Sequence, residues 1–495
     1  MESFDLIIIG AGPGGYVAAI RAAQLGLKVA CIEKESRLGG TCLRIGCIPS
    51  KALLESSFHF FQARNSFQKH GILMEGVKLD LDAMQRRKRQ IVSILTKGVK
   101  TLFLKNKIYH LTGTAFLEAA NIVRIRNSNS NASSDSDSDS NANSNSNANS
   151  NHDSRNDASS NSKNETRLVA GSILIATGSL PARLSTLPFD QKQILSSTEA
   201  LELEEVPKSL AVVGGGFIGL ELGSVWNRLG ANVCIIEATD EILPQMDGDL
   251  ASQARRILSK QGLSFKTKSK VCQVKKHKNE SQIFLDNGEM IFAEKVLVSV
   301  GRVPCSSNLG LEALGVKIDE RRYIFTDSHF ATNVKGIYAL GDVRGGAMLA
   351  HKAAAEGVAF AENLVNGKGN MNYECIPSVV FTDPQIASIG ETEQALIAKN
   401  QGFHKAIFPY RANGRARISG RTEGFVKLLT DKTSGRILGA HLIGDQAGEL
   451  INELALTMHF QQGTEALARS PFAHPTFGEV LQEAALLASG RGIHH

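Results

Sequence analysis

One pattern occurs twice in this chain and limits what it can fold into. Leu6–Lys34 and Leu210–Ala238 each read as an apolar strand, a G-x-G-x-x-G turn, a helix and a second apolar strand, at an offset of 204 residues. Glycine permits the tight turn and lets the backbone approach a pyrophosphate, and the helix that follows directs the positive end of its dipole at the phosphates. One such motif is a weak signal, but two in complete strand–helix–strand context predict two Rossmann-like, dinucleotide-binding units of an α/β fold.

In each copy of the pattern, the second strand ends on a carboxylate that can bind the ribose of a nucleotide. Glu33 and Glu237 each follow the first glycine of their turn by 23 residues, where an acid accepts hydrogen bonds from ribose hydroxyls. Glu237 would repel the 2′-phosphate of NADP, and residues 238–243 include two further acids and no Arg or Lys. The second unit is therefore predicted to bind NAD.

The composition excludes several classes of protein. Hydrophobic residues make up 42% and charged residues 21% of the 495 residues, so the chain is neither disordered overall nor fibrous. There is no run of about 18 apolar residues to predict a membrane helix. A net charge of +6 with a single Trp gives no sign of a nucleic-acid surface, and the basic run Arg86–Arg89 is predicted to be a solvated helix face. The first strand starts by Phe4 and seven Cys are too few for a disulfide scaffold, so we expect a cytoplasmic protein without a targeting segment.

One tract departs from this composition. Residues 127–166 contain 12 Asn and 14 Ser and no Val, Ile, Leu, Phe or Met. Such a segment cannot bury enough apolar surface to offset the entropy of ordering it, so we predict a disordered insertion. Because the cost of closing a loop rises slowly with its length, the insertion should extend a hairpin between the strand-like pieces 122–125 and 168–171 and leave the fold intact.

Two of the seven cysteines lie close together in sequence. Cys42 and Cys47 follow a Gly-Gly-Thr turn directly after the first predicted nucleotide-binding unit. A zinc site would need a second Cys or His pair at suitable spacing, and the sequence has none, so no metal site is predicted. A dithiol that closes a small ring and passes electrons to a neighbouring flavin fits better. A helix start and the nearby Arg44 would both favour a thiolate.

The segment around these cysteines, G-G-T-C-L-R-I-G-C-I-P-S-K at 39–51, resembles the active-site signature of the flavin-dependent pyridine nucleotide–disulfide oxidoreductases. The likeness covers nearly the whole chain apart from the Asn/Ser tract. It continues in order through A-T-G at 176–178, V-G-R-V-P at 300–304, L-G-D-V at 340–343, M-L-A-H-K at 348–352, P-S-V-V-F-T-D-P at 377–384 and H-P-T-F-G-E at 474–479.

This resemblance implies a fold, two cofactors and an activity. FAD would bind the first unit, NAD the second, and the C-terminal part would be an α+β dimerisation domain. The I-P-S-K ending is similar to that of members that act on dihydrolipoamide. The implied reaction is therefore oxidation of protein-bound dihydrolipoamide to lipoamide, with electrons passing through Cys42 and Cys47 and through FAD to NAD⁺.

The resemblance also implies roles for individual residues. Cys47 would be the thiol next to the flavin, Cys42 the thiol that exchanges with the substrate, and Lys51 with Glu221 an ion pair beside flavin N5. The residues implied to contact FAD are Gly10, Gly12, Gly14, Gly15, Glu33, Lys34, Gly40, Thr41, Lys51, Gly113, Ala115, Thr177, Gly178, Asp342, Met348, Leu349, Ala350 and His351. Those implied to contact NAD are Gly214, Gly216, Phe217, Ile218, Gly219, Glu237, Val271 and Gly301. Phe217 is either an aromatic gate over the flavin or a packing residue of its helix.

His474 is implied to be the catalytic base. It lies in H-P-T-x-x-E, where Glu479 can reach back to orient the ring and increase its basicity. In the family this dyad comes from the other subunit, so the resemblance implies a homodimer with shared sites and a cis peptide bond at His474–Pro475. The implied partners are the lipoyl domains of 2-oxoacid dehydrogenase or glycine cleavage complexes, with no nucleic acid and no membrane.

Three other functions remain open at this point. A glutathione-type reductase would use the same dithiol but usually takes NADP, which Glu237 disfavours. A mercuric reductase would add a C-terminal cysteine pair, whereas this chain ends R-G-I-H-H. A non-catalytic assembly subunit would not need the intact dithiol and dyad. One departure from the family is Arg44, at a position where relatives commonly carry Asn, and it can change the redox properties of the thiols.

We predict four segments along the chain. They are an FAD-binding domain over 1–188 with the insertion at 127–166, an NAD-binding domain over 189–303, a central segment 304–372 that completes the FAD domain through Asp342, and a dimerisation domain over 373–495.

Overall fold

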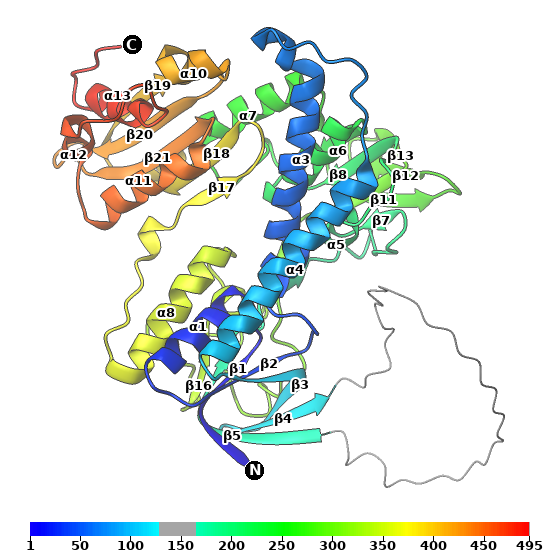
Figure 1. Ribbon diagram of the computed structural model, residues 1–495, viewed down its shortest axis with the longest axis vertical. Helices are drawn as coiled ribbons and strands as arrows, with labels where there is room; N and C mark the ends of the chain where they lie inside the picture. The colour runs from blue at the N-terminus through cyan, green and yellow to red at the C-terminus, as the bar shows by residue number, and fades with distance from the viewer. Residues whose placement is uncertain (128–164, 495) are drawn as a thin grey trace. The chain divides into compact units, whose positions relative to one another are not determined.

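The computed structural model describes residues 1–127 and 165–494 (Figure 1). The predicted disorder of 127–166 lies outside these residues except at its ends, where Asn127 closes one strand and Glu165 opens the next. The chain divides into two compact units. The first comprises Met1–Leu38, Val99–Gly178 and Pro304–Gly369, and the second comprises Gly39–Gly98, Ser179–Val303 and Asn370–His495.

A largely parallel sheet forms the centre of the first unit. β1 (Glu2–Ile9) lies between β2 (Val29–Glu33) and β5 (Glu165–Ile175), and the sheet continues to β3 (Tyr109–Ala119) beyond β2 and to β16 (Ile337–Ala339) beyond β5. The apolar run of β1 is buried, as expected for a strand with both faces covered. Helices α1 (Pro13–Gln24) and α8 (Ala350–Asn366) pack side by side in this unit (Figure 1).

The strands on either side of the Asn/Ser tract form the expected hairpin. β4 (Ile122–Asn127) pairs antiparallel with β3 and with β5, and Arg126 lies opposite Glu165. The two ends of the tract are therefore neighbours in one sheet, and the paired strands do not depend on the residues between them.

The second unit contains the second copy of the repeated pattern. Its parallel sheet has the order β10-β9-β8-β14-β7, and the three-stranded sheet β11-β12-β13 is antiparallel. The elements are β6 (Ser179–Pro181), β7 (Ile194–Leu195), α5 (Ser197–Ala200), β8 (Ser209–Val213), α6 (Phe217–Leu229), β9 (Asn232–Ile236), α7 (Gly248–Lys260), β10 (Ser264–Lys266), β11 (Val271–Lys276), β12 (Ser281–Leu285), β13 (Met290–Ala293), β14 (Lys295–Val298) and β15 (Arg302–Pro304). The two parallel sheets confirm the predicted pair of dinucleotide-binding folds.

Four helical segments run between the two copies of the pattern. They are α2 (Gly40–Ile45), α3 (Cys47–Asn65), η1 (Phe67–His70) and α4 (Leu81–Lys105). The prediction that Arg86–Arg89 form a solvated helix face is wrong for Lys88, whose side chain is 1% exposed. Its ammonium donates to the Leu201 carbonyl oxygen at 2.6 Å and to Glu202 Oε1 at 2.5 Å, so this face of α4 packs on the turn that follows α5.

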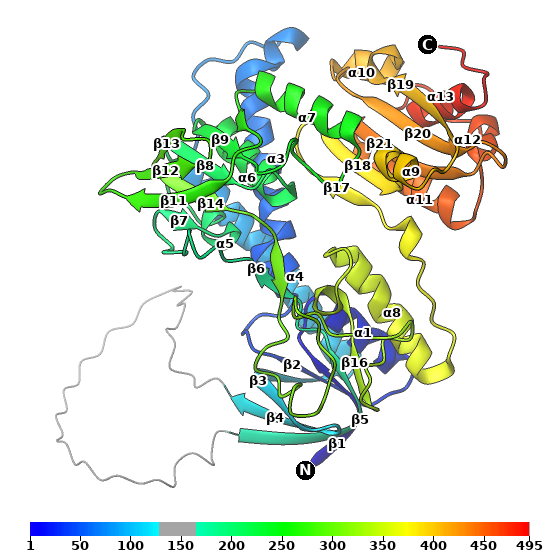
Figure 2. The ribbon, with the colours of Figure 1, turned by 180° about the vertical axis from the view of Figure 1, so that it is seen from behind.

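The C-terminal part of the second unit is an antiparallel sheet with helices, which confirms the predicted α+β class. The strand order is β17 (Ser378–Val380), β18 (Gln385–Gly390), β21 (Ile437–Gly444), β20 (Phe425–Asp431) and β19 (Phe403–Pro409). Helix α11 (Ala447–His459) lies along β18 and β21, and α13 (Glu479–Ala488) lies along β19 and β20 (Figure 2). The shorter elements are η4 (Tyr373–Cys375), α9 (Glu393–Ala398), η5 (Tyr410–Ala412), α10 (Gly414–Ser419) and α12 (Thr464–Arg469).

A buried cation joins three elements of the second unit. Lys427 in β20 has no exposed side-chain surface, and its ammonium donates to Asp247 Oδ1 and Asp249 Oδ2 at 2.7 Å each and to Glu393 Oε2 at 2.5 Å. Burial disfavours the charged amine, but the three carboxylates together raise the pKa of Lys427 above its ordinary value. The cluster ties the N-termini of α7 and α9 to the antiparallel sheet.

Candidate active site

The first glycine turn has the geometry that a dinucleotide requires. Gly10 adopts φ +101°, and a Cβ there would lie 2.5 Å from the Ala176 carbonyl oxygen. The turn leads into α1, whose N-cap Gly12 provides no side-chain cap. Pro13, the first residue of α1, has no N–H, so the backbone N–H groups of Gly14 and Gly15 are those at this helix start that suit phosphate oxygens.

Glu33 is attached to this turn. Its Oε2 accepts from the Ala11 N–H at 2.8 Å and its Oε1 from the Glu35 N–H at 3.2 Å, and the residue is 6% exposed. The carboxylate is therefore held in place beside the turn, at the end of β2. These residues fit a nucleotide at the carboxyl edge of the parallel sheet.

The second glycine turn repeats this geometry in the second unit. Gly214 adopts φ +107°, and a Cβ there would lie 2.5 Å from the Ser299 carbonyl oxygen. Gly216 is the N-cap of α6 and again offers no side-chain cap. Glu237 accepts from the Gly215 N–H at 2.7 Å and from the Thr239 N–H at 2.9 Å.

Two cations that the sequence pattern did not indicate lie near the acids after Glu237. Arg255 from α7 pairs with Glu241 at 2.7 Å, and Lys268 pairs with Asp240 at 3.4 Å. Each cation is paired with a carboxylate of the chain itself, so the prediction that the second unit prefers NAD over NADP continues to depend on Glu237.

The other predicted FAD contacts fall in both units. Those of the first unit are Gly10, Gly12, Gly14, Gly15, Glu33, Lys34, Gly113, Ala115, Thr177, Gly178, Asp342, Met348, Leu349, Ala350 and His351, whereas Gly40, Thr41 and Lys51 belong to the second. Within the first unit the ends of β1, β5 and β16 meet, because Ala176 N–H donates to Ile9 and Leu340 N–H to Ile175. The Ala115 side chain is 4% exposed and packs in the core, so only its backbone can face a nucleotide.

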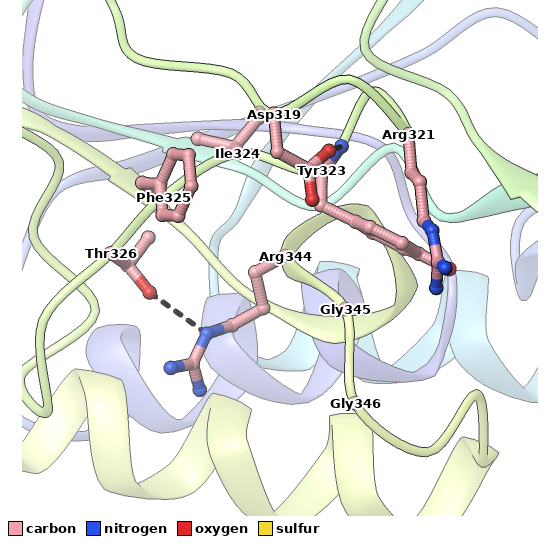
Figure 3. Close-up of a pocket in the computed structure, with 9 residues that line it drawn as sticks. All are labelled: Asp319, Arg321, Tyr323, Ile324, Phe325, Thr326, Arg344, Gly345 and Gly346. Carbon is pink, nitrogen blue, oxygen red and sulfur yellow. Dashed lines mark hydrogen bonds between the residues drawn. The ribbon is translucent and has the colours of Figure 1, made fainter.

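Asp342 lies in a short turn, η3 (Gly341–Arg344), whose first and last residues are bound by Glu356. Glu356 is fully buried; its Oε2 accepts from the Gly341 N–H at 2.7 Å and its Oε1 from Arg344 Nη1 at 3.0 Å. Arg344 Nε also donates to Thr326 Oγ1 at 2.8 Å (Figure 3).

A cavity of about 410 Å³ lies beside η3, between Arg344–Gly346 and the segment from Asp319 to Thr326 (Figure 3). None of the predicted FAD contacts line it.

The predicted NAD contacts all lie in the second unit. Phe217 and Ile218 open α6 and are partly buried against the core around α6, which agrees with a packing role for Phe217. Val271 begins β11 and is 6% exposed, and Gly301 adopts φ +122° just before β15. Their contact with NAD stays a prediction.

The two close cysteines are separated by a break between helices. Cys42 lies in α2 and Cys47 is the first residue of α3, with Gly46 between the helices. Both are present as thiols, and Cys42 donates a hydrogen bond to Cys47. This bond lowers the pKa of Cys47 from 9.0 to about 7, against the opposing effect of burial and with help from the Lys51 ammonium. The same bond and burial raise the pKa of Cys42 far above its ordinary value.

Cys47 is therefore the residue that carries a thiolate near neutral pH, and Cys42 is its hydrogen-bond donor. The position of Cys47 at the start of α3 adds the favourable end of the helix dipole. The cation that favours the Cys47 thiolate is Lys51, one turn further along the same helix. From the sequence we expected Arg44 to have this effect.

Lys51 forms the predicted ion pair with Glu221 of α6. Lys51 Nζ lies 2.6 Å from Glu221 Oε2, and the Glu221 side chain is 6% exposed. Phe381, which sequence reasoning did not single out, contacts both partners. Its N–H donates to Glu221 Oε1 at 3.0 Å, and its ring centroid lies 4.7 Å from Lys51 Nζ.

His474 and Glu479 form a hydrogen bond in the structure. His474 Nδ1 lies 2.8 Å from Glu479 Oε1, and the Thr476 N–H donates to Glu479 Oε2 at 2.8 Å. Partial burial favours the neutral acid, but these hydrogen bonds hold the pKa of Glu479 below its ordinary value. The His474–Pro475 bond is cis, as predicted. The His474 side chain is 77% exposed, so its Nε2 is open to a substrate or a second chain.

Within residues 1–127 and 165–494, no group of three or more His, Cys, Asp or Glu side chains is arranged to hold a metal ion. No helix of the same residues is long and apolar enough to cross a membrane.

Comparison with known proteins identifies the class. A profile of the pyridine nucleotide-disulphide oxidoreductases matches residues 4–357, and the profile of their dimerisation domain matches residues 376–485. The chain belongs to this family. It is an oxidoreductase that uses FAD and NAD, in agreement with its two glycine turns and its dithiol.

Several named proteins are similar over their full length. A mitochondrial dihydrolipoyl dehydrogenase of Pisum sativum is 41% identical, with 99% of this chain and 92% of the relative covered. A leghemoglobin reductase of Glycine max is 42% identical, with 99% and 88% covered. Among solved structures, the flavoprotein disulfide reductase RclA of Escherichia coli has a TM-score of 0.82 at 25% identity, with 98% of this chain and 100% of the other covered. LpdA of Mycobacterium tuberculosis shares the fold, with a TM-score of 0.84 at 24% identity and 98% and 99% covered.

Proposed function

We propose that this chain is a dihydrolipoamide-oxidising enzyme, which reoxidises protein-bound dihydrolipoamide and passes the electrons to NAD⁺. The observation that carries the proposal is the Cys42–Cys47 thiol pair, in which Cys42 donates a hydrogen bond to Cys47 at the start of α3, together with the Lys51–Glu221 ion pair that begins from the same helix. Relatives named dihydrolipoyl dehydrogenase at 41% and 42% identity give the substrate class.

The reaction begins with a proton transfer to His474. Glu479 fixes the ring through Nδ1, which leaves Nε2 to take the proton of one dihydrolipoamide thiol. The resulting thiolate attacks Cys42 Sγ of the oxidised Cys42–Cys47 pair, a new S–S bond forms to the substrate, and the Cys42–Cys47 bond breaks. Cys47 leaves as a thiolate, which its low pKa favours because a thiol of lower pKa is a better leaving group.

The second substrate thiol completes the exchange. It attacks the substrate sulfur bonded to Cys42, which closes the lipoamide disulfide and breaks the bond to Cys42 Sγ. Its proton passes to the departing Cys42 sulfur, whose raised pKa favours the thiol. The substrate has then lost two electrons and two protons, and the Cys42–Cys47 pair has gained the two electrons. Lys51 stabilises the Cys47 thiolate during this step.

The rest of the reaction depends on the two cofactors and on the residues that would hold them. The first glycine turn with Glu33, Asp342 and Met348–His351 would hold FAD, and the second turn with Glu237 would hold NAD. When bound, FAD would supply the two-electron transfer between the dithiol and NAD⁺, with the nicotinamide receiving a hydride. Lys51 and Glu221 are proposed to lie beside the flavin on the nicotinamide side.

We further propose that the chain works as a homodimer and serves lipoyl domains of 2-oxoacid dehydrogenase or glycine cleavage complexes. The match to the dimerisation domain and the exposure of His474 on its own chain support a dyad that acts on the partner's dithiol. The cytoplasm is our proposed compartment, although relatives carry mitochondrial names, and the location of a full-length fluorescent fusion tests it.

The test is steady-state reduction of NAD⁺ by dihydrolipoamide with the flavin-loaded protein, with NADP⁺ in parallel. We expect turnover with NAD⁺, little with NADP⁺, and loss of turnover in Cys42→Ser. Cys375→Ser is the matched control, because this cysteine lies in η4 outside the predicted site. Absence of turnover with dihydrolipoamide, together with reduction of glutathione disulfide by NADPH, would contradict the proposal.

A further inference from the structure

The Lys51–Glu221 ion pair has a third participant. Phe381 follows β17 directly, and its backbone N–H donates a hydrogen bond to Glu221 Oε1 at 3.0 Å. Lys51 Nζ donates to the other oxygen, Glu221 Oε2, at 2.6 Å. The Phe381 ring lies beneath the same ammonium, 4.7 Å from centroid to nitrogen. One residue therefore contacts both charges of the pair, through two different groups.

Phe381 is fixed on both sides. The preceding residue, Val380, is fully buried and pairs with Ile386 of β18. Two residues further on, the Asp383 carboxylate is bound by Arg421, and the Asp383 carbonyl oxygen accepts from Gln261 Nε2 at 2.6 Å. The ring itself packs against the core around α6. Its position is thus set by the sheet and not by the lysine.

The Lys51 side chain, in contrast, has four rotatable bonds and is 32% exposed. The net free energy of an ion pair to a flexible lysine is reduced by the entropy lost when the lysine side chain is held in one conformation. An aromatic face under the ammonium restricts it and adds an attraction that grows as water is excluded. The ammonium then stays at the Glu221 carboxylate and near the start of α3.

This placement matters for Cys47. The side chains that act on its thiol are Cys42 from α2, Lys51 from α3 and Glu221 from α6, and the Cys47 backbone N–H also favours the thiolate. Lys51 favours the thiolate and Glu221 disfavours it, so the balance depends on where the ammonium is held.

We propose that Phe381 is a positioning residue of the redox site: its ring and its N–H together hold the Lys51 ammonium where it stabilises the Cys47 thiolate. The inference deepens the proposed function, because the thiolate is the leaving group of the proposed exchange. The experiment that tests it uses neither lipoamide nor NAD⁺. A negative result would therefore contradict the role of Phe381 without bearing on the proposed substrate.

The test measures the reactivity of Cys47 in flavin-loaded protein of the Cys42→Ser background, where a hydroxyl keeps the hydrogen-bond donor. The rate of iodoacetamide alkylation at Cys47 is followed by mass spectrometry from pH 5 to pH 10 and normalised to its high-pH plateau. Phe381→Leu keeps the N–H and most of the apolar volume but removes the aromatic face. Phe381→Trp restores an aromatic face. Phe284→Leu is the matched control, since the Phe284 ring also lies under a lysine, Lys275, but in the sheet β11-β12-β13.

We expect Phe381→Leu to lower the normalised rate at pH 7 about two- to five-fold by moving the midpoint to higher pH. Phe381→Trp should return the midpoint toward that of the parent, and Phe284→Leu should leave it unchanged. A midpoint that does not move in Phe381→Leu overturns the proposal. So does an equal shift in the Leu and Trp variants, because packing alone, and not the aromatic face, would then account for the effect. Thermal unfolding and flavin content identify any variant that is misfolded; Phe381→Met then replaces the Leu variant, and Phe381→Tyr replaces the Trp variant.

Discussion

The hydrogen bond from Cys42 to Cys47 can be tested by removing its donor. Cys42→Ala leaves Cys47, Lys51 and Glu221 in place and takes away the thiol that lowers the pKa of Cys47 most. Because the variant cannot form the Cys42–Cys47 disulfide, Cys47 remains a thiol throughout the measurement.

The size of the effect follows from the pKa of Cys47. A thiol with a pKa of about 7 is half ionised at pH 7, whereas one at the ordinary value of 9.0 is ionised in about one molecule in a hundred. The difference corresponds to about 3 kcal/mol of preferential stabilisation of the thiolate. Since burial and Glu221 both raise the pKa, loss of the Cys42 donor should bring the pKa of Cys47 to 9.0 or above, with Lys51 and the Cys47 backbone N–H as the remaining favourable groups.

The assay is the pH profile of iodoacetamide alkylation at Cys47 in the flavin-loaded protein. Rates are normalised to the plateau at high pH, because a thiolate of higher pKa is intrinsically more nucleophilic. We expect the midpoint to move from about pH 7 in Cys42→Ser, which keeps a donor, to pH 9 or above in Cys42→Ala. If Cys42→Ala keeps a midpoint near pH 7, the hydrogen bond is not the cause of the low pKa and the assignment of the two thiols has to be revised.

Four further outcomes are expected. Glu479→Gln should lower kcat for dihydrolipoamide about 10- to 100-fold while sparing alkylation of Cys47, because it removes the charged partner of His474 Nδ1; an unchanged kcat speaks against the dyad. Glu237→Ala should raise KM for NAD⁺ about 10- to 100-fold, since a hydrogen bond to a charged group contributes roughly 1.5–3 kcal/mol, and steady-state kinetics at saturating dihydrolipoamide checks this. Lys427→Met should cost about 3–5 kcal/mol of unfolding free energy in urea titrations by leaving the buried Asp247 carboxylate without its lysine partner, and Lys427→Met combined with Asp247→Leu should regain part of it. Replacement of residues 128–164 by Asn-Gly should leave the melting temperature and kcat unchanged, because Arg126 and Glu165 already face each other across the hairpin; a loss of either would assign the tract a role.

The nucleotide-binding turns and the dithiol could be predicted from sequence because each is a local feature. The glycines of the two turns, with Glu33 and Glu237 at a fixed distance, lie within single strand–helix–strand units, and the spacing alone fixes which groups meet. The His474–Glu479 contact spans five residues and was predictable for the same reason. These features required no knowledge of how distant segments pack.

Contacts between distant segments could not be predicted in this way. Phe381 and Glu221 are 160 residues apart, and the bond between them involves a backbone N–H that carries no sequence signal. Lys88 was expected to be solvated because it lies in a basic run, yet the backbone of Leu201, 113 residues away, accepts from its ammonium. The pairing of Lys427 with Asp247 joins residues 180 apart. In each case, packing of one element on another decides which charged group is buried.

The two ribose acids have a consequence for how selectively the chain recognises its cofactors. Both oxygens of Glu33 and both of Glu237 are already bound to backbone or hydroxyl donors of their own turns. A carboxylate oxygen has two acceptor positions, so each acid can receive a ribose hydroxyl without giving up these bonds. The acid is therefore already immobile and oriented when the nucleotide arrives, and binding does not have to order it. At Glu237, the proposed ribose acceptor of the NAD site, an acceptor held in this way would not move aside for a 2′-phosphate, so the backbone bonds that orient it would also exclude NADP.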